Sequence, residues 1–258
     1  MVKEETESPL RSTARRLARA AAGVSRVVVL TGAGISAESG IPTFRDPDGV
    51  WARFRPEDLA SPEAFRQDPK LVWDWYRARA ENVDRVKPNQ GHESLARMEE
   101  RFAGLTIITQ NVDGLHRAAG SSRVIELHGN LRRARCTRCP AVFGLSEARA
   151  QDDDMPHCPA CGALARPDIV WFGEMLPEDA LGQAFEVSSR AELFFVVGTS
   201  ALVHPAASLP YVAARSGAVL VEVNPRETPV STDADFVFRA RAGEALPVIL
   251  EEFLENRA

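Results

Sequence analysis

The four cysteines of the chain stand in two closely spaced pairs, Cys136-x2-Cys139 and Cys158-x2-Cys161, with eighteen residues between the pairs. This spacing is typical of a zinc ribbon, in which each pair supplies two thiolates to one tetrahedral ion. Four sulfur ligands leave no open position for water, so we expect one structural Zn²⁺ per chain that takes no part in catalysis. Disulfide pairing is the alternative, which the reduced thiols of a cytosolic protein disfavour.

Glycine or small polar residues follow five β-branched or aromatic runs, in the segments TGAG, TQNVD, HGN, GTS and NP. Ligands of an open parallel sheet bind beyond the carboxyl ends of its strands. Glycine allows a ligand to approach the backbone closely, and small polar side chains supply hydrogen bonds. One nucleotide-sized cleft would explain all five segments.

The first of these segments contains Gly32, Gly34 and Ala37, which fit the G-x-G-x-x-G/A pattern of dinucleotide-binding turns. The pattern alone is a weak signal, because the acidic residue expected about 20 positions further on has no clear counterpart. A tight turn without a ligand is the alternative. Pro42 and Pro47 resist a regular helix after the turn, so we expect an irregular loop that is able to close over a ligand.

The elements that must position these residues alternate short β-branched runs with longer helical stretches, which predicts an α/β fold with a parallel sheet. The expected strands span 26–30, 105–109, 123–127, 193–197, 218–223 and 235–238. The expected helices span 9–22, 69–82, 91–101, 178–189, 205–216 and 243–256. The cysteine segment interrupts this alternation, so we expect it to form a small insert in the larger domain.

Composition limits the partners of the chain. Its 258 residues are 45% hydrophobic and 26% charged, and 31 Lys and Arg against 36 Asp and Glu give a net charge of −5. We therefore expect no direct contact with nucleic acid, which requires clustered cations. Because no stretch approaches the roughly 18 apolar residues of a membrane helix and MVKEETESPL lacks the order of a signal peptide, we expect a cytoplasmic protein without membrane contact. We also expect a monomer.

Seven motifs occur in one order along the chain: GAGISAESGIPTFRDPDGVW, TQNVDGLHRAAG, VIELHGN, the two CxxC pairs, VWFGE, GTS and VEVN. The set resembles the sirtuin family of NAD-dependent protein deacylases over about residues 14–254. The resemblance implies a discontinuous Rossmann-like domain over 9–131 and 165–256 that holds NAD. It also implies a zinc-binding small domain over 132–164, with part of 45–90 as a helical insert, and an acyl-lysine protein or peptide between the two domains.

The resemblance further implies roles for the residues that match its motifs. His128 would be the general base, since an imidazole titrates near the working pH, and Asn111 and Asp113 would complete the catalytic group. Without the resemblance, an Asx turn explains Asn111 and Asp113 equally well, and a structural role explains a lone histidine. The implied cofactor contacts are Gly32, Ala33, Gly34, Glu38, Phe44, Arg45, Gln110, Asn111, Asp113, Gly198, Thr199, Ser200 and Asn224.

In the chemistry that the resemblance implies, the acyl oxygen attacks the ribose carbon as nicotinamide leaves, and the base then activates a ribose hydroxyl. The products would be nicotinamide, 2'-O-acyl-ADP-ribose and free lysine. The substrate backbone would pair as an added strand with Val170, Trp171, Phe172, Gly173 and Glu174. The alternatives are a protein ADP-ribosyltransferase that uses the same NAD site and a non-enzymatic, zinc-dependent module that senses NAD.

Tyr76 and Arg79 stand three residues apart in WDWYRARAE, so a helix would place both on one face. A guanidinium fork fits a carboxylate and a phenol adds a hydroxyl, which suits succinyl, malonyl or glutaryl lysine. The pair resembles the Tyr-x-x-Arg pair of desuccinylating sirtuins, and Ala60 would leave room for a longer acyl chain. An ordinary amphipathic helix with solvated Arg77 and Arg79 is the alternative.

Overall fold

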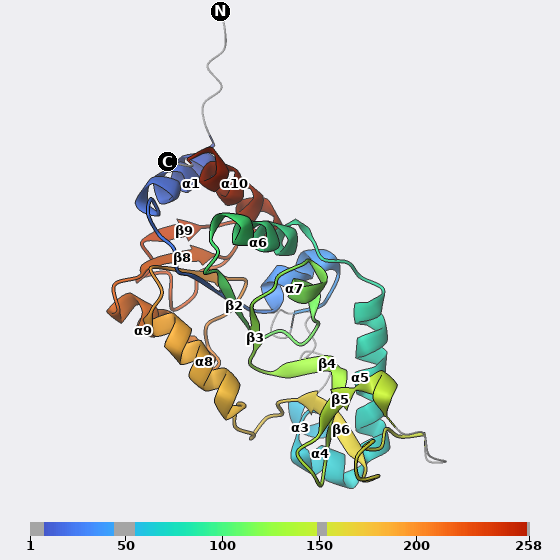
Figure 1. The fold of residues 1–258 in the computed structure, drawn as a ribbon. Helices are drawn as coiled ribbons and strands as arrows, with labels where there is room; N and C mark the ends of the chain where they lie inside the picture. Colours follow the sequence, from blue (N-terminus) through green and yellow to red (C-terminus); the bar gives the residue numbers. More distant parts are fainter. Residues whose placement is uncertain (1–7, 44–54, 149–153, 257–258) are drawn as a thin grey trace, which may run out of the picture.

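A computed structural model describes residues 8–43, 55–148 and 154–256 of the chain, so the expected cofactor-loop residues Phe44 and Arg45 lie outside the described residues. Its larger part is built around a six-stranded sheet with the order β3-β2-β1-β7-β8-β9 (Figure 1). All neighbouring strands of this sheet pair in parallel, which confirms the predicted α/β fold. The strands are β1 (Val27–Thr31), β2 (Thr106–Thr109), β3 (Val124–Glu126), β7 (Leu193–Val197), β8 (Val219–Val223) and β9 (Phe236–Phe238).

Helices cover both faces of this sheet. On one face, α1 (Pro9–Ala20), α6 (Gln90–Arg101) and α10 (Ala242–Glu255) pack around Val27 and Val29 of β1. On the other face, α8 (Glu178–Ser189) and α9 (Leu209–Arg215) pack with Val28 and Leu30. Successive residues of a strand point to opposite faces, so a strand covered on both sides is apolar throughout, as the sequence pattern indicated.

A second, smaller lobe carries the cysteines. Its three-stranded antiparallel sheet has the order β5-β4-β6, formed by β4 (Gly129–Cys136), β5 (Val142–Gly144) and β6 (Ala165–Ile169). The helices α3 (Pro56–Leu59), α4 (Pro62–Gln67) and α5 (Pro69–Asp84) lie beside this sheet (Figure 1). Trp73 of α5 donates its indole N–H to the Ala165 carbonyl at 2.9 Å, which ties the longest of these helices to β6.

Short elements complete the chain and include one departure from the expected helices. The 3-10 helices are η1 (Ala33–Ser39), η2 (Leu145–Glu147) and η3 (Ala206–Ser208), and α7 (Leu115–Ala118) is a single turn. The helix expected over 205–216 is present, but its first turn is the 3-10 helix η3 and the α-helix α9 starts only at Leu209. Pro210 lies in the first turn of α9, where its missing N–H costs nothing.

The small sheet also extends beyond the predicted limits of the zinc-binding domain at 132 and 164. Strand β4 starts at Gly129, and its partner β6 occupies 165–169. In GNLRRARC the adjacent Arg132 and Arg133 interrupt the alternation of apolar and polar residues, so the sequence did not indicate a strand. Within the described residues, no helix combines the length and the apolar character that crossing a bilayer requires.

Candidate active site and zinc centre

The parallel register brings the ends of the central strands to one edge of the large sheet. Thr31 at the end of β1 lies opposite Thr109 of β2 and Val197 of β7. Thr109 in turn lies opposite Glu126 of β3, and Val197 lies opposite Val223 of β8. The segments that follow these strands therefore start side by side, as the sequence predicted.

The glycine turn after β1 packs directly against the turn after β7. The N–H groups of Gly32 and Gly34 donate to the carbonyls of Val197 and Gly198 at 3.1 and 2.8 Å. A Cβ atom on Gly34 would lie 2.7 Å from the Gly198 oxygen, and one on Gly32 would lie 2.7 Å from Thr199 Cβ. Both glycines are therefore required by the approach of two backbones, and the turn continues as the 3-10 helix η1.

Asn111 and Asp113 are buried and meet at the hydroxyl of Ser36, a residue that the sequence did not single out. Ser36 donates to Asp113 Oδ2 at 2.8 Å, and the Asn111 amide donates to Ser36 Oγ at 3.2 Å and to the Gly32 carbonyl at 3.1 Å. Asp113 Oδ1 also accepts from the Leu115 N–H at 2.9 Å, so the Asx turn is present as well. Burial raises the pKa of Asp113, against the opposing effect of these two donors.

Two further buried histidines support this cluster. His92 accepts from the Asn89 N–H through Nδ1, which leaves the proton on Nε2, 3.4 Å from Ser36 Oγ. His116 Nε2 lies 2.9 Å from Thr31 Oγ1, and the centroids of the two imidazole rings are 5.0 Å apart. Burial lowers the pKa of His92 to about 4 and that of His116 to about 3, so both rings are neutral at pH 7.

His128 follows β3 and has the geometry of a general base. Its Nδ1 lies 2.9 Å from the Gln110 carbonyl, which can only accept, so Nδ1 carries the proton and Nε2 keeps its lone pair. Burial lowers the pKa of His128, although the hydrogen bond to Gln110 opposes that shift. The imidazole is therefore neutral and basic at Nε2 near pH 7.

The backbone around His128 is held by the small lobe. The His128 carbonyl accepts from the Val170 N–H at 3.0 Å. Gly129 has a φ of +86°, and a Cβ there would lie 1.9 Å from the Asp168 carbonyl oxygen, so only glycine fits where β4 leaves the sheet edge. The position of the imidazole thus depends on how β6 packs against β4.

The expected peptide-binding segment 170–174 is a turn around Gly173, whose φ is +85°, and is not an extended strand. The N–H groups of Val170, Phe172 and Glu174 already donate to the carbonyls of His128, Ala60 and Trp171. These three donors are therefore already used within the protein, and pairing of a substrate backbone with this segment stays a prediction. The Phe172 side chain is 50% exposed beside this turn and offers an apolar contact.

Tyr76 and Arg79 lie on one face of α5, as predicted. The buried Tyr76 hydroxyl accepts from the Trp171 indole N–H at 2.9 Å, and burial raises the pKa of Tyr76 to about 12. The Arg79 guanidinium lies 4.6 Å from the Trp75 ring and 5.8 Å from the Tyr76 ring. Burial lowers the pKa of Arg79, while Tyr76 and Asp113 raise it. Arg79 is thus half-buried beside two aromatic rings and within the field of Asp113.

The remaining residues that we expected to contact the cofactor differ in the groups to which they bond in this structure. Gln110 donates through Nε2 to Thr199 Oγ1 at 2.9 Å, and Asn224 donates through Nδ2 to the Thr199 carbonyl at 2.8 Å. The Glu38 carboxylate accepts from the Gly243 N–H at 2.7 Å, so this side chain joins η1 to the start of α10. Ala33 starts η1, and Ser200 follows Thr199 in the turn after β7.

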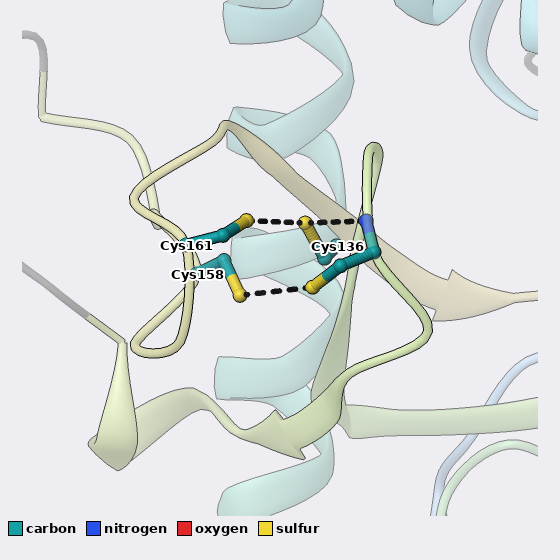
Figure 2. Close-up of side chains that lie close together, drawn as sticks. Cys136, Cys158 and Cys161 are labelled. Atoms are coloured by element: carbon teal, nitrogen blue, oxygen red, sulfur yellow. Dashed lines mark hydrogen bonds between the residues drawn. The ribbon is translucent and has the colours of Figure 1, made fainter.

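The four cysteine Sγ atoms all lie within 4.8 Å of one another. Cys136 Sγ and Cys161 Sγ are 3.5 Å apart, and Cys139 Sγ and Cys158 Sγ are 3.7 Å apart (Figure 2). Tetrahedral Zn–S bonds of ~2.3 Å place the sulfurs about 3.8 Å apart, so the arrangement fits a zinc ion. The Ala163 N–H lowers the pKa of Cys161, whereas the neighbouring Cys136 thiol raises the pKa of Cys139, so the distances between the sulfurs are what supports a zinc ion here.

Comparison with known proteins identifies the class to which this fold and site belong. A model described as the Sir2 family matches residues 32–205. The chain is 51% identical over 230 residues to an NAD-dependent protein deacylase of Aquifex aeolicus (strain VF5), covering 89% of this chain and 96% of the relative. The chain belongs to the Sir2 family, as its motifs indicated.

Solved structures agree with this assignment. A crystal structure of a Sir2 homologue with NAD superposes with a TM-score of 0.85 and 47% identity, covering 93% of each chain. A Sir2 complex with a p53 peptide and NAD⁺ has a TM-score of 0.80 and 38% identity, covering 92% of this chain and 97% of the other.

We expect Cys136→Ser to abolish zinc binding and to lower the melting temperature, because the free energy of zinc binding contributes to the folding free energy of the small lobe. Elemental analysis and thermal unfolding test this. Ser146→Ala, an exposed change in the same lobe, is expected to keep one zinc per chain. A C136S protein with full zinc content and unchanged melting would contradict the assignment.

We expect kcat/KM for an acyl-peptide to rise with pH and to level off, with the midpoint of the acid limb below 6.5. The base must be neutral to accept a proton, and burial lowers the pKa of His128 from its ordinary value of 6.5. A pH–rate profile at saturating NAD measures this midpoint. A midpoint clearly above 6.5 would mean that the imidazole is not held neutral by burial.

We expect His128→Ala to reduce deacylation by about 10²- to 10⁴-fold, the usual contribution of a positioned base. Exchange of labelled nicotinamide into NAD in the presence of acyl-peptide should survive, because that step does not need the base. Equal loss of exchange and deacylation would show that His128 acts before or during nicotinamide release.

Proposed function

We propose that this chain removes acyl groups from lysine side chains of proteins and consumes NAD in the process. The observation that carries the proposal is the neutral imidazole of His128, whose Nε2 lone pair is fixed by the Nδ1 contact with the Gln110 carbonyl. The neighbouring Asn111 and Asp113 supply buried polar groups at the same sheet edge. Burial of such polar groups costs free energy unless they are hydrogen-bonded, and the bonds to Ser36 and to the Gly32 carbonyl fix the Asn111 and Asp113 side chains in place.

The residues present at this edge fit a dinucleotide. Gly34 and Gly198 let the turns after β1 and β7 pack against each other at the sheet edge, and the amides of Asn111, Gln110 and Asn224 are oriented there by hydrogen bonds. Bound NAD supplies a ribose carbon that accepts the acyl oxygen when nicotinamide leaves, and a ribose hydroxyl that then carries the acyl group.

The protein groups in this chemistry have distinct tasks. His128 Nε2 accepts a proton from a hydroxyl donor, and Gln110 keeps the imidazole in the reactive tautomer. The Asn111 amide is held in a fixed orientation by Ser36 and Gly32, and Asp113 holds Ser36. These residues therefore orient ligand groups, whereas the cysteine cluster lies in the small lobe and serves as structure.

Mass analysis of an acylated protein treated with NAD tests the proposal directly. We expect a loss of the acyl mass from lysine, with nicotinamide and O-acyl-ADP-ribose formed in equal amounts. A gain of ADP-ribose mass on the protein would favour the ADP-ribosyltransferase alternative. NAD binding without any turnover would favour a sensing module.

We further propose that the enzyme accepts acyl groups with a carboxylate end, such as succinyl, malonyl or glutaryl lysine, besides acetyl lysine. Arg79 lies half-buried against Trp75 and Tyr76, where a charged hydrogen bond from its guanidinium to a ligand carboxylate is less screened by solvent than at an exposed site. The Tyr76 hydroxyl accepts from Trp171, so its own hydrogen is available for a ligand oxygen. Ala60 contributes only a methyl group next to this pair, in the same apolar cluster as Tyr76.

We expect Arg79→Met to lower kcat/KM for a succinyl-lysine peptide by about 10- to 150-fold, which corresponds to the ~1.5–3 kcal/mol of a charged hydrogen bond. Deacetylation of the same peptide should change less than about threefold, since acetyl carries no charge. Parallel kinetics on the two peptides measure the difference.

Arg77→Met is the matched control, because Arg77 lies on the same helix but bonds to the Asp154 carbonyl. We expect it to leave the ratio of the two activities unchanged. Equal loss of both activities in R79M, or an equal change of the ratio in R77M, would contradict the anion-binding role of Arg79.

We also propose that the chain acts as a cytoplasmic monomer on protein substrates and does not bind nucleic acid or membranes. Support comes from the four free cysteines, whose spacing suits a metal in a reducing compartment, and from the net charge of −5. Light scattering of the purified protein gives the oligomeric state.

A further inference from the structure

One strand of the large sheet contains a fully buried carboxylate that the proposed chemistry does not use. Glu222 lies on β8 among valine and leucine residues, and its side chain is 0% exposed. Its Oε2 accepts from Arg239 Nη1 and from the Ser231 hydroxyl, both at 2.6 Å, and its Oε1 accepts from the Thr228 hydroxyl. A buried ion pair is weak evidence for stability, because desolvation cancels much of the attraction.

The partners of Glu222 all belong to the segment that follows β8 or to the residue that follows β9. Thr228 and Ser231 lie in the segment 224–231, while Arg239 comes directly after β9. Arg239 also donates to the carbonyls of Arg226 and Asn224 at 3.2 and 3.5 Å, and to Ser231 Oγ at 2.8 Å. A single guanidinium thus fixes the start and the end of this segment.

The segment 224–231 reaches the glycine turns of the site through Asn224. Its backbone N–H donates to the Phe238 carbonyl at 3.1 Å, and its side-chain amide donates to the Thr199 carbonyl at 2.8 Å. Its Oδ1 accepts from the Arg226 N–H at 3.1 Å. Asn224 is therefore held beside Thr199. The hydrogen bonds of Arg239 and Glu222 hold the segment 224–231, which starts with Asn224.

The strand order indicates which half of a dinucleotide this segment meets. His128 follows β3, whereas Asn224 follows β8, and β2, β1 and β7 lie between these two strands. A dinucleotide whose nicotinamide ribose faces His128 and whose phosphates lie near the central turns extends its adenosine half toward β8. The polar groups after β8 are placed to meet that adenosine half.

We propose that Glu222 and Arg239 are positioning residues for NAD: they hold the segment 224–231 so that Asn224 contacts the adenosine half of the cofactor. The inference rests on the proposed use of NAD at this sheet edge. Neither residue touches the reacting atoms. Their loss weakens cofactor binding without altering the chemical step.

Glu222→Gln and Arg239→Lys test the proposal in the full-length, zinc-loaded protein. We expect E222Q to raise KM for NAD and Kd for ADP-ribose by about tenfold, the equivalent of one charged hydrogen bond. The kcat at saturating NAD and KM for acetyl-lysine peptide should stay within about twofold. R239K keeps the positive charge but loses the planar guanidinium with its several donors. We therefore expect it to raise KM for NAD and Kd for ADP-ribose by less than E222Q does.

Glu252→Gln is the matched control. Glu252 is a second buried glutamate, 1% exposed at its side chain, that pairs with Arg11 and Arg15 between α10 and α1. We expect E252Q to lower the melting temperature but to leave Kd for ADP-ribose unchanged. Thr228→Val, which removes one donor to Glu222, serves if E222Q fails to fold, and should raise Kd for ADP-ribose by at least threefold.

Separate readouts distinguish failure of this inference from failure of the proposed function. The positioning role would be overturned by any of three results. Kd for ADP-ribose could stay unchanged in folded E222Q or T228V, or it could rise equally in E252Q. The third result is that E222Q lowers kcat and leaves KM for NAD unchanged. A wild-type protein that binds ADP-ribose but turns over no acyl-peptide would overturn the deacylase function alone, while weaker binding by E222Q would still support the positioning role. Wild-type protein that binds no ADP-ribose would overturn both.

Discussion

The parallel register of the large sheet is the constraint on which the site depends. It aligns the ends of β1, β2, β3, β7 and β8 at one edge, so that residues far apart in sequence emerge as neighbours. The contact of Gly34 with Gly198 then locks the turn after β1 onto the turn after β7. Any side chain at these two positions would push the turns apart, which explains why the edge is built from glycine.

Neutral hydrogen-bonding groups set the orientation of the side chains at this edge. His92 and His116 are kept uncharged by burial, and they hold Ser36 and Thr31 at the base of the turn after β1. His128 is held from two sides, by the Gln110 carbonyl of the large sheet and by the Val170 N–H that follows β6. The segment that follows β6 of the small lobe thus contributes to the position of the base.

Much of the large sheet could be predicted from the sequence, because strands buried on both faces, such as LFFVV, are apolar throughout. The cysteine spacing and the motifs at the strand ends likewise predicted the metal cluster and the residues gathered at the edge. The small sheet could not be predicted, since the adjacent Arg132 and Arg133 interrupt the alternation in β4, and the pairing of Arg133 and Arg135 with Asp168 of β6 is visible only in the fold. Ser36 was missed because its partners Asn111 and Asp113 are distant in sequence, and Glu222 and Arg239 were not singled out because only the fold shows that their side chains meet.

The most direct test of the central claim is a crystal structure of the protein with NAD and an acetyl-lysine peptide bound. The account predicts His128 Nε2 within ~2.6–3.2 Å of a ribose hydroxyl, with Nδ1 still bonded to the Gln110 carbonyl and the acyl-lysine between the two lobes. A dinucleotide bound away from the ends of β1, β2 and β3, or an imidazole turned away from the ribose, would contradict it.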